Sequence, residues 1–176
     1  MPADLRYPIG PEPAPVSLSP HAREAAVGDI RDLPRTLRAA VAGLTEPQLD
    51  TPYRPGGWTV RQLTHHVADS HLNAYLRLKL ALTADLPHIT PYDENQWARL
   101  PDSRLPVEIS LRLLDALHAR WVALYESLAA PDFAERRFFH PERGAAITVE
   151  AQLQTYSWHS RHHVAHISTL RERTGW

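Results

Sequence analysis

Histidine is the residue type in this sequence that is best suited to chemistry. The chain has eleven histidines among its 176 residues and no cysteine. Most of the histidines form two groups: His65, His66 and His71, then His159, His162, His163 and His166. Neutral imidazole is a common ligand of divalent transition-metal ions, and without cysteine such an ion must be held by nitrogen and oxygen atoms. The two groups therefore predict a histidine-rich metal site.

The second group contains two pairs with the spacing expected of helical metal ligands. His162 and His166 are one helical turn apart, and so are His159 and His163. A pair at this spacing is already oriented by the helix when an ion arrives. Spacing does not choose between the pairs, because all four side chains lie within about 100° of arc. A catalytic zinc ion usually has three protein ligands, so a third must come from elsewhere.

The first group can supply that third ligand. His65 and His66 are neighbours in the sequence and point about 100° apart on a helix, so only one of them can face the site. His66 shares its stripe of the helix with Asp69 and Asn73, which are candidate catalytic helpers. A cluster of histidines that senses pH without binding any metal is the alternative interpretation.

Four predicted helices must position these side chains. Ser19, Thr59 and Thr148 are placed to cap helix N-termini, Gln62 completes a capping box with Thr59, and Pro106 suits a first turn. Together with apolar residues at helical spacing, these signals predict helices over about 20–44, 59–83, 106–129 and 148–173. Four helices of this length predict an all-α fold, an antiparallel four-helix bundle with a site between facing helices.

The segments between the predicted helices are less regular. Residues 1–18 are rich in proline and predict an extended arm, with Tyr7 and Ile9 available to anchor it. Residues 84–105 predict a long connection, and long connections are often functional. Residues 138–148 predict a small β-hairpin before the last helix. The length fits one domain over residues 1–176.

Composition argues against several classes of partner. Nineteen basic and twenty acidic side chains leave a net charge of −1, so we expect no nucleic acid partner. No run of eighteen apolar residues and no signal peptide is visible, so we expect a cytoplasmic protein with no membrane partner.

Five segments also resemble a known family. They are Tyr-Pro-Ile-Gly at 7–10, Leu-Asp-Thr-Pro-Tyr-Arg-Pro-Gly-Gly-Trp-Thr-Val-Arg-Gln at 49–62, His-His-Val-Ala-Asp-Ser-His at 65–71, the turn around Pro-Tyr-Asp-Glu at 91–94, and Trp-His-Ser-Arg-His-His-Val-Ala-His-Ile at 158–167. Together they closely resemble the YfiT-type members of the DinB-like superfamily, over nearly the whole chain.

This resemblance implies a four-helix bundle with long crossover connections, a three-histidine site and a homodimer. Matched to this sequence, it implies that His66, His162 and His166 hold one divalent metal ion per subunit, with zinc or nickel favoured. His65, His159 and His163 would then support the ligands through hydrogen bonds.

The same resemblance implies a metal-dependent hydrolase that acts on a small-molecule substrate. Metal-bound hydroxide would attack an amide or ester, with Asp69 or Asn73 assisting. One alternative is a thiol S-transferase that activates bacillithiol or a similar low-molecular-weight thiol cosubstrate. Another is a non-catalytic, stress-related module in which the ion only clamps two helices.

Overall fold

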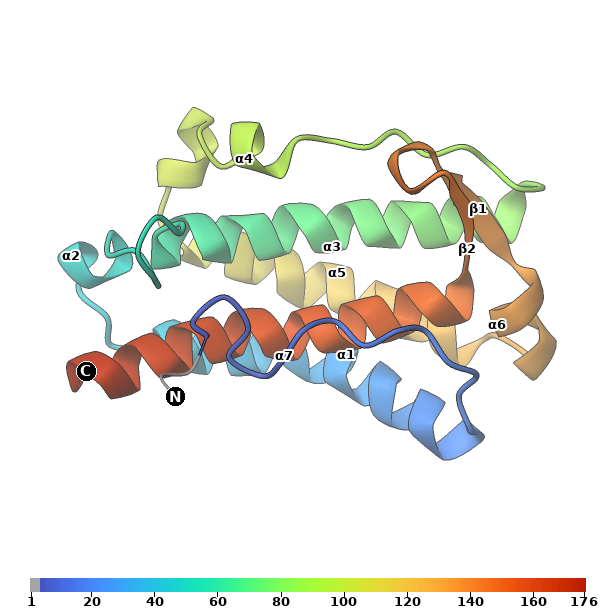
Figure 1. Ribbon diagram of the computed structural model, residues 1–176, viewed down its shortest axis with the longest axis horizontal. Helices are drawn as coiled ribbons and strands as arrows, with labels where there is room; N and C mark the ends of the chain where they lie inside the picture. The colour runs from blue at the N-terminus through green and yellow to red at the C-terminus, as the bar shows by residue number, and fades with distance from the viewer. Residues whose placement is uncertain (1–3) are drawn as a thin grey trace.

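Four long helices form the body of the protein (Figure 1). The computed structural model describes residues 4–176, so residues 1–3 of the predicted arm lie outside the described residues. The long helices are α1 (Pro20–Val41), α3 (Val60–Thr83), α5 (Glu108–Glu126) and α7 (Val149–Thr174). The prediction of a mainly helical four-helix bundle is confirmed.

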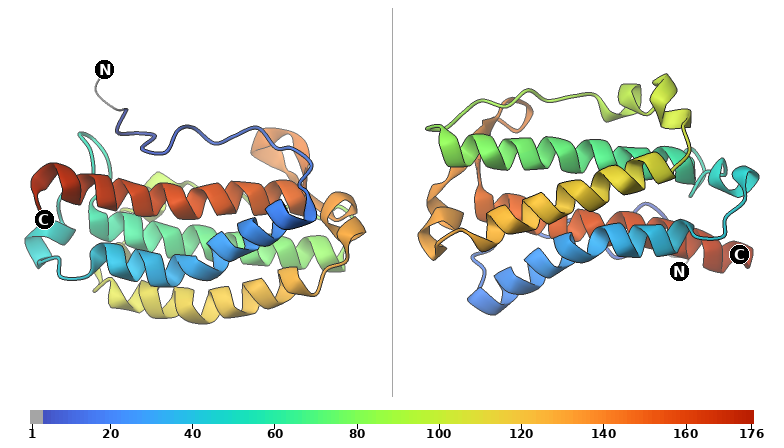
Figure 2. Two further views of the ribbon diagram at one scale, coloured as in Figure 1. Left: turned by 90° about the horizontal axis from the view of Figure 1, so that it is seen from below. Right: turned by 180° about the vertical axis from the view of Figure 1, so that it is seen from behind.

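The order of the helices in the bundle differs from a simple up-and-down arrangement. Helix α1 packs on α5 and α7, and α3 packs on the same two helices. Figures 1 and 2 show that α3 and α5 run in one direction and that α1 and α7 run in the other. Two neighbouring pairs are therefore parallel. Parallel neighbours require the chain to return along the bundle, and residues 84–107, which include the predicted long connection 84–105, make that return (Figure 1).

The N-termini of α1, α3 and α7 begin where the capping signals indicate, whereas α5 begins at Glu108, two residues after the predicted start at Pro106. The Ser19 and Thr148 side chains accept from the backbone N–H groups of Ala22 and Ala151. Thr59 and Gln62 form the predicted capping box at the start of α3. These caps satisfy backbone donors that would otherwise lack partners.

Short elements occupy the connections. Between α1 and α3 lies α2 (Glu46–Leu49), and the crossover contains α4 (Glu94–Trp97) and the 3₁₀ helix η1 (Pro101–Arg104). After α5 come α6 (Ala130–Glu135), β1 (Arg137–His140), the 3₁₀ helix η2 (Pro141–Arg143) and β2 (Ala145–Thr148). Strands β1 and β2 pair antiparallel, with Arg137 opposite Thr148, which confirms the predicted hairpin.

A buried polar layer divides the hydrophobic core into two clusters. One cluster includes Leu78, Trp121 and Leu153, and the other includes Leu63 and Leu114. Along α3, α5 and α7, buried histidines lie between the residues of the two clusters. They are His66, His71, His118, His162, His163 and His166. Buried polar groups of this kind need hydrogen-bond partners or a ligand.

The N-terminal arm lies along α7 (Figure 2). The carbonyl of Val16 and that of Gly10 accept from side chains of Gln154 and Trp158 at 2.8 and 3.3 Å. Tyr7 and Ile9 remain exposed, so hydrogen bonds rather than apolar anchors hold much of the arm. None of the described helices is both long enough and apolar enough to span a membrane.

Candidate metal centre

A cavity of about 430 Å³ opens between α3, α7, the N-terminal arm, the loop before α3 and helix α4. Five of the residues that line it are histidines: His66, His159, His162, His163 and His166. The cavity thus joins the two histidine groups of the sequence, and it is the place where the structure concentrates potential metal ligands.

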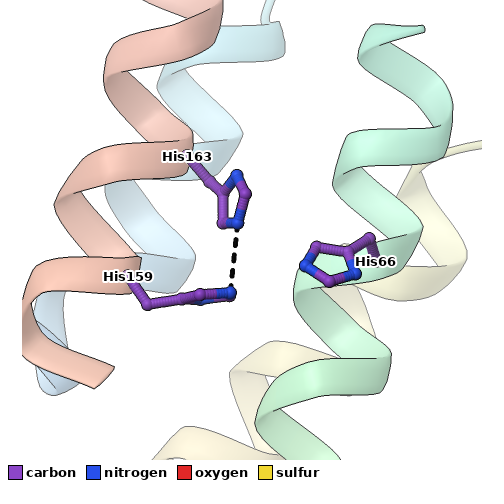
Figure 3. A group of neighbouring side chains, drawn as sticks. All are labelled: His66, His159 and His163. Carbon is purple, nitrogen blue, oxygen red and sulfur yellow. Dashed lines mark hydrogen bonds between the residues drawn. The ribbon is translucent and has the colours of Figure 1, made fainter. Parts of the chain in front are cut away.

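His66, His159 and His163 converge on one point of this cavity. Figure 3 shows His66 reaching from α3 toward the rings of His159 and His163 on α7. One ligand nitrogen from each residue lies within 4.8 Å of the other two. The Nε2 atoms of His159 and His163 are 3.0 Å apart.

These distances suit a single transition-metal ion. Two nitrogens bound at 2.0–2.1 Å in tetrahedral geometry would be about 3.3 Å apart, close to the separation of the two Nε2 atoms on α7. The His66 side chain forms no hydrogen bond to any described residue, so its ring nitrogens remain available. Nδ1 of His163 is buried without a partner among residues 4–176, as are the Nδ1 atoms of His162 and His166, so these atoms do not distinguish the two possible ligand sets. The donor set therefore fits an ion.

The electrostatic environment keeps these imidazoles neutral. Burial lowers the pKa of His66 to about 4. Burial also lowers the pKa values of His159 and His163 well below the usual value, and the neighbouring histidines lower them further. A neutral imidazole has the lone pair that metal binding requires.

The expected ligand set of His66, His162 and His166 does not form one cluster in the structure. His162 and His166 group instead with His163, on the side of α7 that faces the N-terminal arm. Nε2 of His166 donates to the carbonyl oxygen of Arg6 at 3.2 Å, and the His162 ring stacks on Trp158. The physical reason is rotation: residues three apart on a helix differ by about 60° in direction, so the two pairs face different neighbours.

His65 has a structural position outside the cavity. Its Nε2 lies 2.9 Å from the carbonyl oxygen of Leu105 and its Nδ1 lies 2.7 Å from Oγ of Ser110. The ring thus fastens the start of α5 to α3.

The predicted catalytic helpers Asp69 and Asn73 do not line the cavity. The side chain of Asn73 donates to the backbone carbonyl of Asp69 within α3. The cavity instead contains Glu94 and Asn95, at the start of α4. Partial burial, and to a smaller extent repulsion from Asp93, raises the pKa of the Glu94 carboxyl above its usual range.

Glu94 was not predicted as a site residue. It belongs to a four-residue helix within the long crossover, where no periodicity indicates which way a side chain points. The sequence signal that could have found it is an Asp-Glu pair within a long connection. Asp93 caps α4 and thereby fixes the position of Glu94.

Aromatic residues form much of the remaining wall. Tyr53 and Trp58 pack on the rings of His166 and His66, with centroids 4.1 and 4.5 Å apart. Gly57 lies between these aromatic residues, and a Cβ atom there would be 2.8 Å from Cγ of Arg54. Glycine therefore permits the tight loop that brings both aromatic rings to the cavity.

Two arginines also line the cavity, and they differ in their partners. Arg6 forms an exposed ion pair with Asp4 at 2.9 Å. Arg54 lies over the Tyr53 ring and forms no ion pair with any of residues 4–176. The Arg54 guanidinium is therefore available to an anionic group in the cavity.

Known proteins are similar to this chain in sequence. A protein of Bacillus mycoides strain KBAB4, named "putative metal-dependent hydrolase", is 51% identical over 98% of this chain and 99% of its own length. A protein of Bacillus cereus strain ZK / E33L with the same descriptive name has the same identity and coverage.

A solved structure is also similar. YfiT from Bacillus subtilis, described as "a probable metal-dependent hydrolase with an unusual four-helix bundle topology", superimposes with a TM-score of 0.94. It is 47% identical in sequence, and the match covers 99% of each chain. Residues 29–167 match the DinB superfamily, and with the relatives above this match shows that the chain belongs to that superfamily.

Proposed function

We propose that this protein is a metal-dependent hydrolase whose ion is held by His66, His159 and His163. The observation that carries the proposal is the convergence of three neutral imidazoles, within 4.8 Å of one another, on a cavity large enough for a small molecule. The names of the relatives support the same class of activity. The expected set with His162 and His166 is the competing ligand assignment.

A divalent ion bound by three neutral imidazoles supplies Lewis acidity and lowers the pKa of a water or thiol bound to it. The protein must then place a base near the reacting group. Glu94 is the only carboxylate residue among the described lining residues, and its raised pKa is closer to neutral pH than that of an ordinary carboxyl group. We assign it the role of accepting a proton at a carboxylate oxygen and returning it to the leaving group.

The walls of the cavity indicate the kind of substrate. Tyr53, Trp58 and Trp158 provide apolar faces, and Arg54 provides a cation that forms no ion pair with any described residue. A small ester or amide with an apolar group and a carboxylate or phosphate would satisfy both features.

Metal analysis of purified variants tests the ligand assignment. We expect one equivalent of metal in the wild type, and its loss in His159→Ala. The matched control is His162→Ala, one position of the other pair, which we expect to retain the ion. Loss of metal from His162→Ala with retention in His159→Ala would overturn the assignment in favour of the competing set.

Activity assays separate hydrolysis from the alternatives. Zinc-loaded protein should hydrolyse nitrophenyl acetate without a cosubstrate. A thiol S-transferase would instead require added cysteine and an electrophile such as chlorodinitrobenzene. A purely structural ion would support neither reaction, and the open cavity beside the three histidines argues against that role. The homodimer stays a prediction, which analytical ultracentrifugation can test.

A further inference from the structure

A chain of hydrogen-bonded histidines leads away from the proposed metal site into the core. His71 on α3 and His118 on α5 are almost completely buried and do not line the cavity. Nδ1 of His159 lies 3.0 Å from Nε2 of His71, and Nδ1 of His71 lies 3.0 Å from Nε2 of His118. Nδ1 of His118 lies 2.5 Å from the carbonyl oxygen of Ile30 on α1. The chain thus connects four helices.

The backbone of α1 explains why a carbonyl is present at the end of this chain. In an α-helix the carbonyl of residue 30 normally accepts from the N–H of residue 34. Here residue 34 is proline, which has no N–H, so the Ile30 carbonyl loses that helical donor. The imidazole of His118 supplies a donor in its place.

This terminal carbonyl determines the proton position on every ring. A carbonyl oxygen can only accept, so Nδ1 of His118 carries the proton and its Nε2 has a lone pair. Nδ1 of His71 must then donate to that lone pair, which leaves Nε2 of His71 as an acceptor. By the same step, Nδ1 of His159 donates to His71.

The last step reaches the cavity. With its proton on Nδ1, His159 has its lone pair on Nε2, the nitrogen beside His163. The opposite tautomer would place a proton on the nitrogen that a metal ion needs.

We propose that His118 and His71 are positioning residues that hold His159 in the tautomer whose Nε2 lone pair faces the cavity. This inference rests on the proposed role of His159 as a ligand. Outer hydrogen-bond partners of ligating histidines fix the ring and its tautomer, and their loss typically weakens metal affinity about 10- to 100-fold. Here the support extends through two further rings to a backbone carbonyl.

The first test needs no metal. In metal-free protein labelled with ¹⁵N-histidine, two-bond ¹H–¹⁵N NMR correlations distinguish protonated ring nitrogens from those with lone pairs. We expect the proton on Nδ1 and the lone pair on Nε2 for His159, His71 and His118. A wild-type His159 protonated at Nε2 would overturn the proposal, even if the protein binds metal as proposed. If the wild type binds no metal, the proposed function fails while this spectrum still reports on the hydrogen-bond chain.

The second test compares variants at the middle of the chain. His118→Leu removes the acceptor for Nδ1 of His71, so we expect zinc affinity to fall about 10- to 100-fold and the His159 spectrum to show the Nε2-protonated form. His118→Gln keeps an acceptor near that position and should restore most of the affinity. The matched control is His65→Gln, because His65 is also buried and doubly hydrogen-bonded but lies outside the chain.

Unchanged zinc affinity and unchanged His159 tautomer in folded His118→Leu would overturn the proposal. An equal loss of affinity in His118→Leu and His65→Gln would overturn it too, because general loosening of the bundle would explain both. Should His118→Leu not fold, the wild-type spectrum decides the matter, because a His159 ring protonated at Nε2 overturns the proposal.

Discussion

Nε2 of His166 donates a hydrogen bond to the carbonyl oxygen of Arg6, at 3.2 Å, and thereby ties the last long helix to the N-terminal arm. This bond uses Nε2 of His166, a residue that the sequence suggested as a metal ligand, while its Nδ1 has no partner among the described residues. The bonded carbonyl belongs to the peptide bond after Arg6, the arm's only site for trypsin among the described residues before Arg23.

We therefore predict that His166→Ala will loosen the arm without removing the metal. Loss of the hydrogen bond should lower the free energy of unfolding by about 1 kcal/mol and speed trypsin cleavage after Arg6, as followed by mass spectrometry. His162→Ala keeps the bond to Arg6 and should be cleaved at nearly the wild-type rate. A His166→Ala protein with the wild-type cleavage rate would show that other contacts hold this part of the arm.

The buried histidines predict a dependence of stability on pH in the metal-free protein. The pKa values of His66, His118, His162 and His166 are lowered to about 4, by burial first of all, against about 6.5 in an unfolded chain. Between these values the unfolded state binds protons that the native state does not, so stability falls as pH falls. Above about pH 6.5 these groups are neutral in both states, so they do not make the stability depend on pH.

Urea unfolding followed by tryptophan fluorescence at pH 7.5, 6 and 5 measures this effect. We expect the urea midpoint to fall steeply below about pH 6.5. His118→Gln should flatten the dependence, whereas His21→Ala, at an exposed position, should not. A midpoint independent of pH across this range would contradict the burial of neutral imidazoles.

The sequence predicted the helices more completely than their arrangement. Capping residues such as Ser19 and Thr59 are local signals, so the starts of α1 and α3 could be placed to within about one residue. The parallel neighbours α3 and α5 could not be derived from periodicity, because every amphipathic helix has a buried face whichever neighbour covers it. Only the family resemblance implied the crossover, because the 84–105 segment by itself predicted no more than a long connection.

The candidate site could be predicted only in part, for a similar reason. His66, a predicted ligand, lines the cavity, and histidines of the last helix line it too. The choice between the two i,i+4 pairs depends on how α7 is rotated about its axis. That rotation is set by tertiary packing, with His159 and His163 toward α3 and His166 toward the arm. Spacing within α7 carries no information about it.

The Glu94→Gln variant tests whether Glu94, rather than another carboxyl group, is the proton acceptor. Removing a general base typically lowers the rate about 10²- to 10⁴-fold, and we expect that range for kcat of zinc-loaded protein with nitrophenyl acetate. Because the pKa of Glu94 is raised, the wild-type rate should increase with pH as the carboxylate forms, and Glu94→Gln should lose that limb.

Asp69→Asn is the control for this experiment. Burial raises the pKa of Asp69 to about 6, but the side chain does not line the cavity. We expect its kcat and its pH profile to match the wild type. If the rise of kcat with pH disappeared in Asp69→Asn and persisted in Glu94→Gln, Asp69 would be the proton acceptor, in agreement with its prediction from the sequence as a catalytic helper.

Gly57→Ala should damage the aromatic wall of the cavity while leaving the ligands in place. An added Cβ would lie 2.8 Å from Cγ of Arg54, 3.2 Å from the Arg54 carbonyl oxygen and 3.3 Å from Cζ of Tyr53. The arginine side chain can move, but the carbonyl accepts from Gly57 N–H at 3.0 Å and Tyr53 is buried, so the loop itself must shift. Overpacking of this kind costs about 1–3 kcal/mol of stability.

Gly28→Ala provides the matched comparison, because Gly28 lies in α1 and an added Cβ there meets no atom within 4 Å. Alanine at that helical position should stabilise the protein by about 0.5–1 kcal/mol. Urea unfolding should therefore move in opposite directions for the two variants. Gly57→Ala should also raise KM for nitrophenyl acetate and keep one equivalent of zinc, because Tyr53 and Trp58 contact the cavity rather than the ion. Equal stability of Gly57→Ala and wild type would mean that the loop accommodates the methyl group, and the tight turn would then not be needed to position the aromatic wall.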